Sequence, residues 1–209
     1  AAARAVGGCA VYVSDHPGNH DFNILQRLVL PDGSVLRAEL PGRPTRDCLF
    51  SDVTADAESA LKIWNRNKCN GVLGAFNVQG STWDKISRRN WIHSFTPSRL
   101  SVTVKPSDVE GLEKLSTAVG FPGNSGWAVL AMHWTGAGKL KDARLHLLKS
   151  EEALSFKLNQ KEASTFTVSV VHAGRQTNGR LVDWAAFGLE GMFNPGAAIL
   201  AESTKEQKT

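Results

Sequence analysis

Cysteine is scarce in this chain of 209 residues, which holds only Cys9, Cys48 and Cys69. Their number is odd, and their spacing matches neither a zinc site nor a redox pair. We therefore expect free thiols, with Cys9 as a small buried side chain. Such a set favours a reducing compartment, so we expect a cytoplasmic protein, with a plastid as the alternative.

Long apolar runs and a strong charge of one sign are also absent. The composition, 42% hydrophobic and 21% charged, is that of a soluble globular protein, and no run is long enough to span a membrane. The net charge is only +4. Arg88 and Arg89, beside Trp91, are the only compact basic pair near an aromatic residue, and they indicate a solvated hairpin. We expect neither a membrane nor a nucleic acid among the partners.

An initiator methionine is missing as well. Residues 1–6 are rich in alanine and are typical of the last turns of a helix that is interrupted at its amino end. No signal peptide is visible, but without the natural start this says little about targeting of the intact protein. We expect a carboxyl-terminal fragment.

Residues 9–13 are a continuous apolar run introduced by two glycines, as in strands buried on both faces of a parallel sheet. Ser14, Asp15 and His16 follow at once, and after a turn Asp21 is placed to cap a helix. Loops at the carboxyl ends of such strands hold reacting groups in barrels and open parallel sheets. Ser14, Asp15 and His16 are therefore candidate substrate-binding residues.

A metal site is the alternative interpretation of this loop. His16 and His20 lie four residues apart, a spacing that aligns two ligands on a helix. Pro17 and Gly18 between them disfavour a helix. We therefore expect loop residues that hydrogen-bond a substrate or one another, and we predict no metal and no cofactor.

A connector follows, with a turn at residues 31–33, a short strand over residues 35–40 and then several prolines. Arg43, Arg46 and Asp47 allow two interpretations. In the first, these residues bind sugar hydroxyls. In the second, which is the simpler, an arginine and an aspartate form a pair that holds the connector against its neighbour.

From about residue 60 the chain has the pattern of many short strands separated by turn residues, which indicates an antiparallel sandwich. Residues 67–70 and 139–142 are the expected hairpin connections. The predicted strands are residues 61–65, 71–79, 100–105, 127–134, 144–149, 154–158 and 166–171.

All six tryptophans lie in this second part, where they either stack on sugar faces or fill the sheet core, and alternation alone does not separate the two. Residues 184–200 are expected to return as a last strand or two. The polar residues 201–209 are expected to be disordered.

Four segments resemble the carboxyl-terminal part of the plant raffinose synthase and seed imbibition proteins, in glycoside hydrolase family 36. The resemblance implies an α/β plus all-β fold. Residues 1–50 would hold the last strand and helix of a catalytic (β/α)8 barrel and a connector, and residues 51–200 an antiparallel β-sandwich domain. The segments are AAARAVGGCAVYVSDHPGNHDFNIL, LVLPDGSVLRAELPGRPTRDCLF, LKIWNRNKCNGVLGAFNVQG and FGLEGMFNPGAAI.

The resemblance also implies an enzyme that moves galactose from galactinol to sucrose, giving raffinose, by a retaining mechanism with an aspartate nucleophile and a second carboxyl group as acid. Both carboxylates would lie on earlier barrel strands. We therefore expect no catalytic residue in this chain and no activity of the fragment alone. The resemblance leaves Ser14, Asp15 and His16 as a pocket wall, and galactinol, sucrose and raffinose as partners.

Some positions depart from the family pattern. His16 stands where a lysine is common, and Val78 where a cysteine is common. Residues 42–50, GRPTRDCLF, resemble the seed imbibition branch, which keeps hydrolysis of α-galactosides at alkaline pH as an alternative. A free-standing carbohydrate-binding sandwich is a further alternative, disfavoured because an isolated strand and helix would expose their apolar faces.

Overall fold

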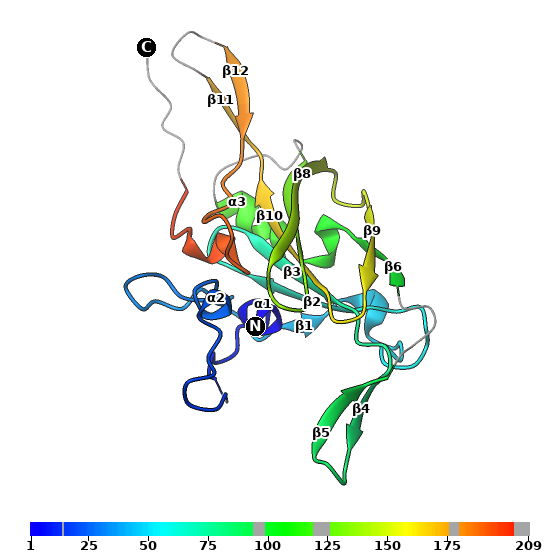
Figure 1. Ribbon diagram of the computed structural model, residues 1–209. Coiled ribbons are helices and arrows are strands. Elements are labelled where there is room, and N and C mark those ends of the chain that lie inside the picture. The colour runs from blue at the N-terminus through cyan, green and yellow to red at the C-terminus, as the bar shows by residue number, and fades with distance from the viewer. Residues whose placement is uncertain (14, 94–98, 119–125, 176–179, 203–209) are drawn as a thin grey trace.

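The computed structural model describes residues 1–13, 15–93, 99–118, 126–175 and 180–202, and most of its regular structure is antiparallel β-sheet (Figure 1). Its centre is a six-stranded sheet in the order β1-β2-β3-β10-β7-β8. The strands of this sheet are β1 (Arg43–Pro44), β2 (Leu61–Arg66), β3 (Gly71–Phe76), β7 (Trp127–Trp134), β8 (Leu140–Leu148) and β10 (Ala163–Val170).

A second, two-stranded sheet of β6 (Arg99–Val104) and β9 (Leu154–Asn159) packs on one face of the large sheet. Leu100, Val102 and Val104 alternate with exposed residues along β6 and are at most 3% exposed, the period of a strand with one buried face. They meet the fully buried Phe166 of β10 in the main core. This packing confirms the antiparallel β part of the predicted fold.

The opposite face of the large sheet is covered by the two ends of the described chain. Helix α1 (Ala2–Gly7) buries Ala5 there, and Leu28 follows helix α2 (Phe22–Leu25) into the same cluster. From the other end, the Phe193 ring packs 4.6 Å from the Trp134 ring, centroid to centroid. The sheet is thus the middle of three layers.

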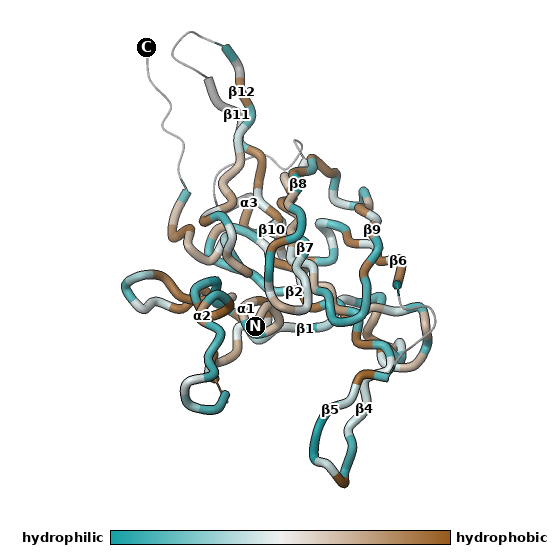
Figure 2. The backbone as a smooth tube through the Cα atoms, viewed as in Figure 1, coloured by the Kyte–Doolittle hydropathy of each residue, from teal (hydrophilic) through white to brown (hydrophobic). Residues whose placement is uncertain are grey.

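The remaining elements lie at the rim. The hairpins β4–β5 (Ser81–Asp84 and Arg89–Ile92) and β11–β12 (His172–Arg175 and Leu181–Trp184) project at opposite ends of the molecule (Figure 1). Figure 2 shows a single hydrophobic point at the tip of β4–β5 next to hydrophilic segments, and Ile86 in this turn is 96% exposed. Short helices η1 (Arg46–Cys48), η2 (Pro106–Asp108), α3 (Leu112–Ala118) and η3 (Pro195–Ala198) complete the fold. No helix among the described residues has the length and hydropathy to cross a membrane.

The predicted strand over residues 9–13 is not found. Those residues have no regular structure, Cys9 is exposed rather than buried, and Tyr12 is 65% exposed beneath the Arg4 guanidinium. A strand buried on both faces needs hydrogen-bonded neighbours and two covering layers. Among the described residues no strand pairs with this segment, so the predicted barrel end is not confirmed. Residues 35–40 also form no strand, and only Val35 makes a bridge, to Val29.

Most of the later strand predictions are confirmed. β7 matches its predicted bounds, and residues 67–70 connect β2 to β3 as a hairpin. The connection predicted at residues 139–142 is displaced, because β8 already begins at Leu140 and the turn lies over residues 135–139. The pairing of β7 with β8 is irregular between His133 and Trp134, next to this turn.

The last strands predicted over residues 184–200 are largely wrong. Only Trp184 belongs to a strand, and the described chain then runs irregularly into η3. Gly188 has φ +87°, and a Cβ there would collide with the carbonyl oxygen of Pro195. Glu202 lies in the segment expected to be disordered, yet its Oε2 is within hydrogen-bond distance of His172 Nε2, at 2.8 Å, and both side chains are buried.

Side-chain amides replace a strand ladder in holding this terminal segment. Asn67 and Asn194 form two reciprocal amide hydrogen bonds of 2.9 Å, and Asn67 also donates to Asn70 at 2.8 Å. Asn70 in turn donates to the carbonyl of Gly196 at 3.2 Å. All three asparagines are at most 2% exposed. Bulk water therefore cannot replace a hydrogen-bond partner that one of them loses.

We expect Asn194→Ala to lower the free energy of unfolding by about 2 kcal/mol, because it removes the hydrogen bonds that Oδ1 and Nδ2 of buried Asn67 make to Asn194, and Nδ2 alone keeps its bond to Asn70. Urea denaturation followed by circular dichroism measures the change. Asn23→Ala is the matched control, since that side chain is exposed. Equal stability of the two variants would contradict the structural role of the cluster.

Candidate functional site

The loop that precedes α2 holds two of the predicted site residues, Asp15 and His16, while Ser14 lies outside the described residues. The Asp21 carboxylate accepts hydrogen bonds from the backbone N–H groups of Asn23, at 3.0 Å, and Ile24, at 3.4 Å, and so fixes the start of α2 as predicted. His16 is exposed. Asp15 lies 3.5 Å from the ring nitrogen Nδ1 of His20, an ion pair whenever that histidine is protonated.

A hollow of about 290 Å³ lies beside this loop. Arg4, Tyr12 and Asp15 contribute polar groups to it, and Val11 and Leu28 an apolar side. His16 is not among the lining residues. The loop therefore presents one of its predicted residues, Asp15, to a concave surface.

The connector residues make local contacts elsewhere. The Arg43 guanidinium lies 5.7 Å from the centre of the Trp64 ring. Arg46 Nε pairs with Glu110 Oε1 at 2.8 Å, and Asp47 Oδ2 lies 2.5 Å from Lys62 Nζ. The Asp47 pair fastens the connector to β2, and the Arg46 pair joins it to the loop between η2 and α3. Arg46 and Asp47 line a second hollow, so the predicted site residues are divided between two places.

Lys62 pairs with two of the carboxylates that line this second hollow, those of Asp47 and Asp108. This residue was not predicted from the sequence. Its side chain is only 6% exposed, and its ammonium donates to the Thr103 carbonyl at 2.7 Å and approaches Asp108 at 3.4 Å. Burial acts to raise the pKa of Asp47, but the hydrogen bonds from Lys62 and Thr45 outweigh it and hold that pKa below its usual value. Asp47 is therefore ionised at neutral pH.

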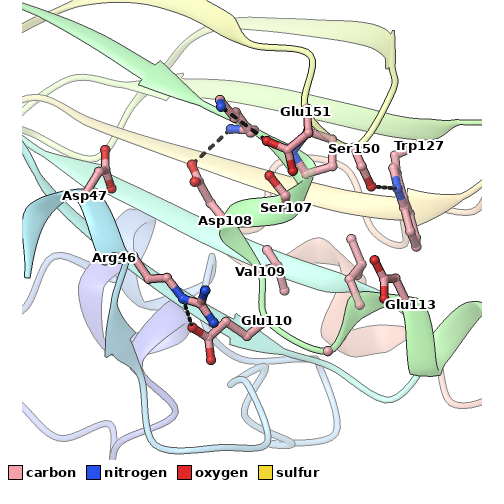
Figure 3. A pocket seen from close by; sticks show the side chains of 14 residues that line it. Arg46, Asp47, Ser107, Asp108, Val109, Glu110, Glu113, Trp127, Ser150 and Glu151 are labelled. Atoms are coloured by element: carbon pink, nitrogen blue, oxygen red, sulfur yellow. Dashed lines mark hydrogen bonds and ion pairs between the residues drawn. The ribbon is translucent and has the colours of Figure 1, made fainter.

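The second hollow holds about 440 Å³ between η2, the start of α3 and the Trp127 end of β7 (Figure 3). Trp127 Nε1 donates to Ser150 Oγ at 3.1 Å, which fixes the indole at one side. Lys105 Nζ pairs with Glu151 Oε2 at 3.3 Å. A sequence signal was present in the closely spaced carboxylates of Asp108, Glu110 and Glu113, but it indicates a solvated loop equally well.

Within the described ranges, no group of three or more histidine, cysteine, aspartate or glutamate side chains is arranged to hold a metal ion. The charged residues that line the two hollows instead take part in ion pairs and hydrogen bonds. Such groups recognise polar ligands through hydrogen bonds.

Fold and hollows together define a class: a layered antiparallel β protein that carries carboxylate-bearing polar hollows outside its core. The chain belongs to the family described as raffinose synthase or seed imbibition protein Sip1, which matches residues 1–208.

Curated relatives agree with this membership. The chain is 45% identical over 204 residues to a probable galactinol–sucrose galactosyltransferase 1 of Arabidopsis thaliana. The aligned residues make up 96% of this chain and 25% of that relative. It is 40% identical over 201 residues to a galactinol–sucrose galactosyltransferase of Oryza sativa subsp. japonica, covering 95% and 24%. It is 34% identical over 210 residues to a stachyose synthase of Pisum sativum, covering 96% and 22%. The chain thus spans about a quarter of the length of these relatives.

Proposed function

We propose that this chain is the carboxyl-terminal part of a raffinose synthase-like enzyme that transfers galactose from galactinol to sucrose. The observation that carries the proposal is the family match over residues 1–208, with relatives named for this activity at up to 45% identity. The proposed sugar partners are galactinol, sucrose and raffinose, and the proposed location is the cytoplasm.

The reaction would proceed with retention through a covalent galactosyl-enzyme intermediate, formed by an aspartate and assisted by a second carboxyl group that protonates the leaving oxygen. Both groups would belong to the part of the protein that precedes this chain. In the same proposal residues 1–50 end the catalytic barrel and residues 51–200 form the β domain. Asp15, beside its hollow, would contact substrate as part of the pocket wall.

Hydrolysis of α-galactosides is the second candidate function. Water and an acceptor sugar compete for the same intermediate, so a small change in the pocket shifts the balance between them. The sequence of residues 42–50 favours this candidate, since it resembles the seed imbibition branch. A free-standing sugar-binding module is disfavoured by exposed Tyr12 and Phe22 on the amino-terminal segment.

The complete reading frame, assayed with galactinol in the presence and absence of sucrose, separates these candidates. Raffinose formed only when sucrose is present supports the transferase. Free galactose at equal rates with and without sucrose supports the hydrolase. If the enzyme forms neither raffinose nor free galactose, both candidate functions are contradicted.

In that complete enzyme we expect Asp15→Ala to lower kcat/KM about tenfold, because the pocket wall loses a charged hydrogen-bond acceptor for a sugar hydroxyl. Steady-state kinetics with galactinol measures the change. Asp183→Ala removes an exposed carboxylate from β12 and is the matched control, expected to leave kcat/KM unchanged. Unchanged kinetics of a folded Asp15→Ala enzyme would refute the role of this residue.

A further inference from the structure

The hollow beside η2 has the size of a small-molecule site. Its volume of about 440 Å³ lies within the roughly 300–1,000 Å³ of ligand pockets. It shares Asp47 with a smaller hollow of about 190 Å³ that reaches Ser59 and Ser101, so a polar surface continues from one to the other. A ligand longer than one sugar ring has room along this surface.

Charged groups of both signs border the hollow as pairs. Arg46 with Glu110, and Lys105 with Glu151, each join through one carboxylate oxygen. Asp108 Oδ2 accepts a hydrogen bond from Lys62 Nζ, and Glu110 Oε1 accepts one from Arg46 Nε. The second oxygen of each carboxylate makes no hydrogen bond among the described residues. Hydrogen bonds from Ser107 and Lys105 lower the pKa of Glu151. Ionised acceptors therefore stand next to guanidinium and ammonium donors.

This mixture selects against ligands of one charge. An anion would meet the carboxylates of Asp47, Asp108, Glu110, Glu113 and Glu151, and a cation would meet Arg46 and Lys105. A hydroxyl group, in contrast, both donates and accepts, so adjacent hydroxyls satisfy an acceptor and a donor side by side. The polar lining fits a neutral ligand that carries several hydroxyl groups.

The hollow also has an apolar side. Val109, Leu112 and Trp127 line it through small exposed edges, each residue being at most 7% exposed. The Ser150 bond holds the indole in place, as Figure 3 shows at one border of the hollow. Sugar and cyclitol rings carry C–H groups that pack on such edges while their hydroxyls meet polar groups.

We propose that this hollow binds a neutral polyhydroxylated ring, a saccharide or a cyclitol. The binding is a property of this chain itself and does not depend on the transferase activity proposed above. It also gives Glu110, between η2 and α3, a role as one of the acceptors.

The test is a titration of the ¹⁵N-labelled 209-residue chain, followed by nuclear magnetic resonance at the Trp127 indole N–H, which Trp127→Phe identifies. We expect a saturable shift with raffinose or sucrose if the ligand is a saccharide, and with myo-inositol if it is a cyclitol. Spermidine serves as the cation probe. Each neutral compound is added up to about 0.1 M, so that even binding weaker than millimolar is detected. The proposal is overturned if none of the three gives a saturable shift. A shift with spermidine alone also overturns it.

Matched variants locate the site. Glu110→Gln/Glu151→Gln is expected to weaken binding at least tenfold, because two ionised acceptors become neutral while the side-chain shapes are kept. Both carboxylates are partly or largely exposed, at 39% and 75%, so the fold should tolerate the change, and thermal melting checks this. Glu190→Gln, an exposed position that does not line the hollow, should bind as the unchanged chain does. Equal affinity in both variants refutes the assignment, and the indole titration of the unchanged chain stands even if the double variant unfolds.

Discussion

Phe166→Ala is expected to lower the free energy of unfolding by about 4 kcal/mol, the largest stability effect that we predict for this chain. Phe166 lies at the middle of β10 with no exposed surface. Its ring centroid lies 5.3 Å from that of Phe156 of β9 and 6.3 Å from that of His133 of β7, so it joins the two sheets. Truncation opens a cavity between strands that cannot move together without breaking their ladders.

Phe50→Ala is the matched control, because that ring is 95% exposed and its removal opens no cavity. Denaturation by guanidinium chloride, monitored by circular dichroism, gives both values. We expect the control to change stability by less than about 0.5 kcal/mol. A similar loss in the two variants would show that Phe166 does not join the sheets.

Lys62→Met is expected to cost about 3 kcal/mol, although it replaces a buried charge with an apolar side chain of similar length. The ammonium approaches both Asp47 and Asp108 and also donates to the Thr103 carbonyl. Its removal leaves two carboxylates without this cation, one of them only 18% exposed. The same denaturation experiment measures this loss.

Lys141→Met is the control for this substitution. Lys141 pairs with Glu162 but is 54% exposed, and pairs of this kind contribute less than about 1 kcal/mol. Equal losses for the two lysines would contradict the buried role of Lys62.

The effect of Lys62→Met should also depend on pH. Asp47 has a folded pKa below its ordinary value of 3.8, so its contribution to stability is present above pH 3.8 and is lost as the pH falls through the folded pKa. The variant lacks the ammonium that lowers this pKa. The stability difference between the two proteins should therefore narrow below about pH 3.8, and a constant difference would contradict the pairing.

Local sequence predicted those elements whose environment is supplied by their own neighbours. β7 was placed correctly because an eight-residue run rich in apolar and aromatic residues is bounded by Gly126 and Gly136. Residues 9–13 have an equally strong strand pattern, but a doubly buried strand depends on partners far away in the sequence. The pattern records the environment that such a segment needs, and it does not establish that the partners are present.

The candidate sites divide in the same way. Asp15 was predicted because polar residues follow an apolar run along the chain, and the structure places it beside a hollow. Asp21 was predicted as a helix cap because capping is local, and this cap is confirmed. Lys62 and Glu110 were not found, because their partners come from other segments and meet only once the strand register is set. Register depends on the whole sheet, and no short pattern contains it.

The position of β10 has a consequence for the order of assembly. β10 lies between β3 and β7 in space, yet it is the last of the six strands of the large sheet along the chain. During synthesis β2 and β3 can pair early as a hairpin, as can β7 and β8, but the two halves remain unjoined until residue 170 is available. Contacts between segments so distant in sequence form slowly, so nascent chains that stop before β10 carry two open strand edges prone to aggregation.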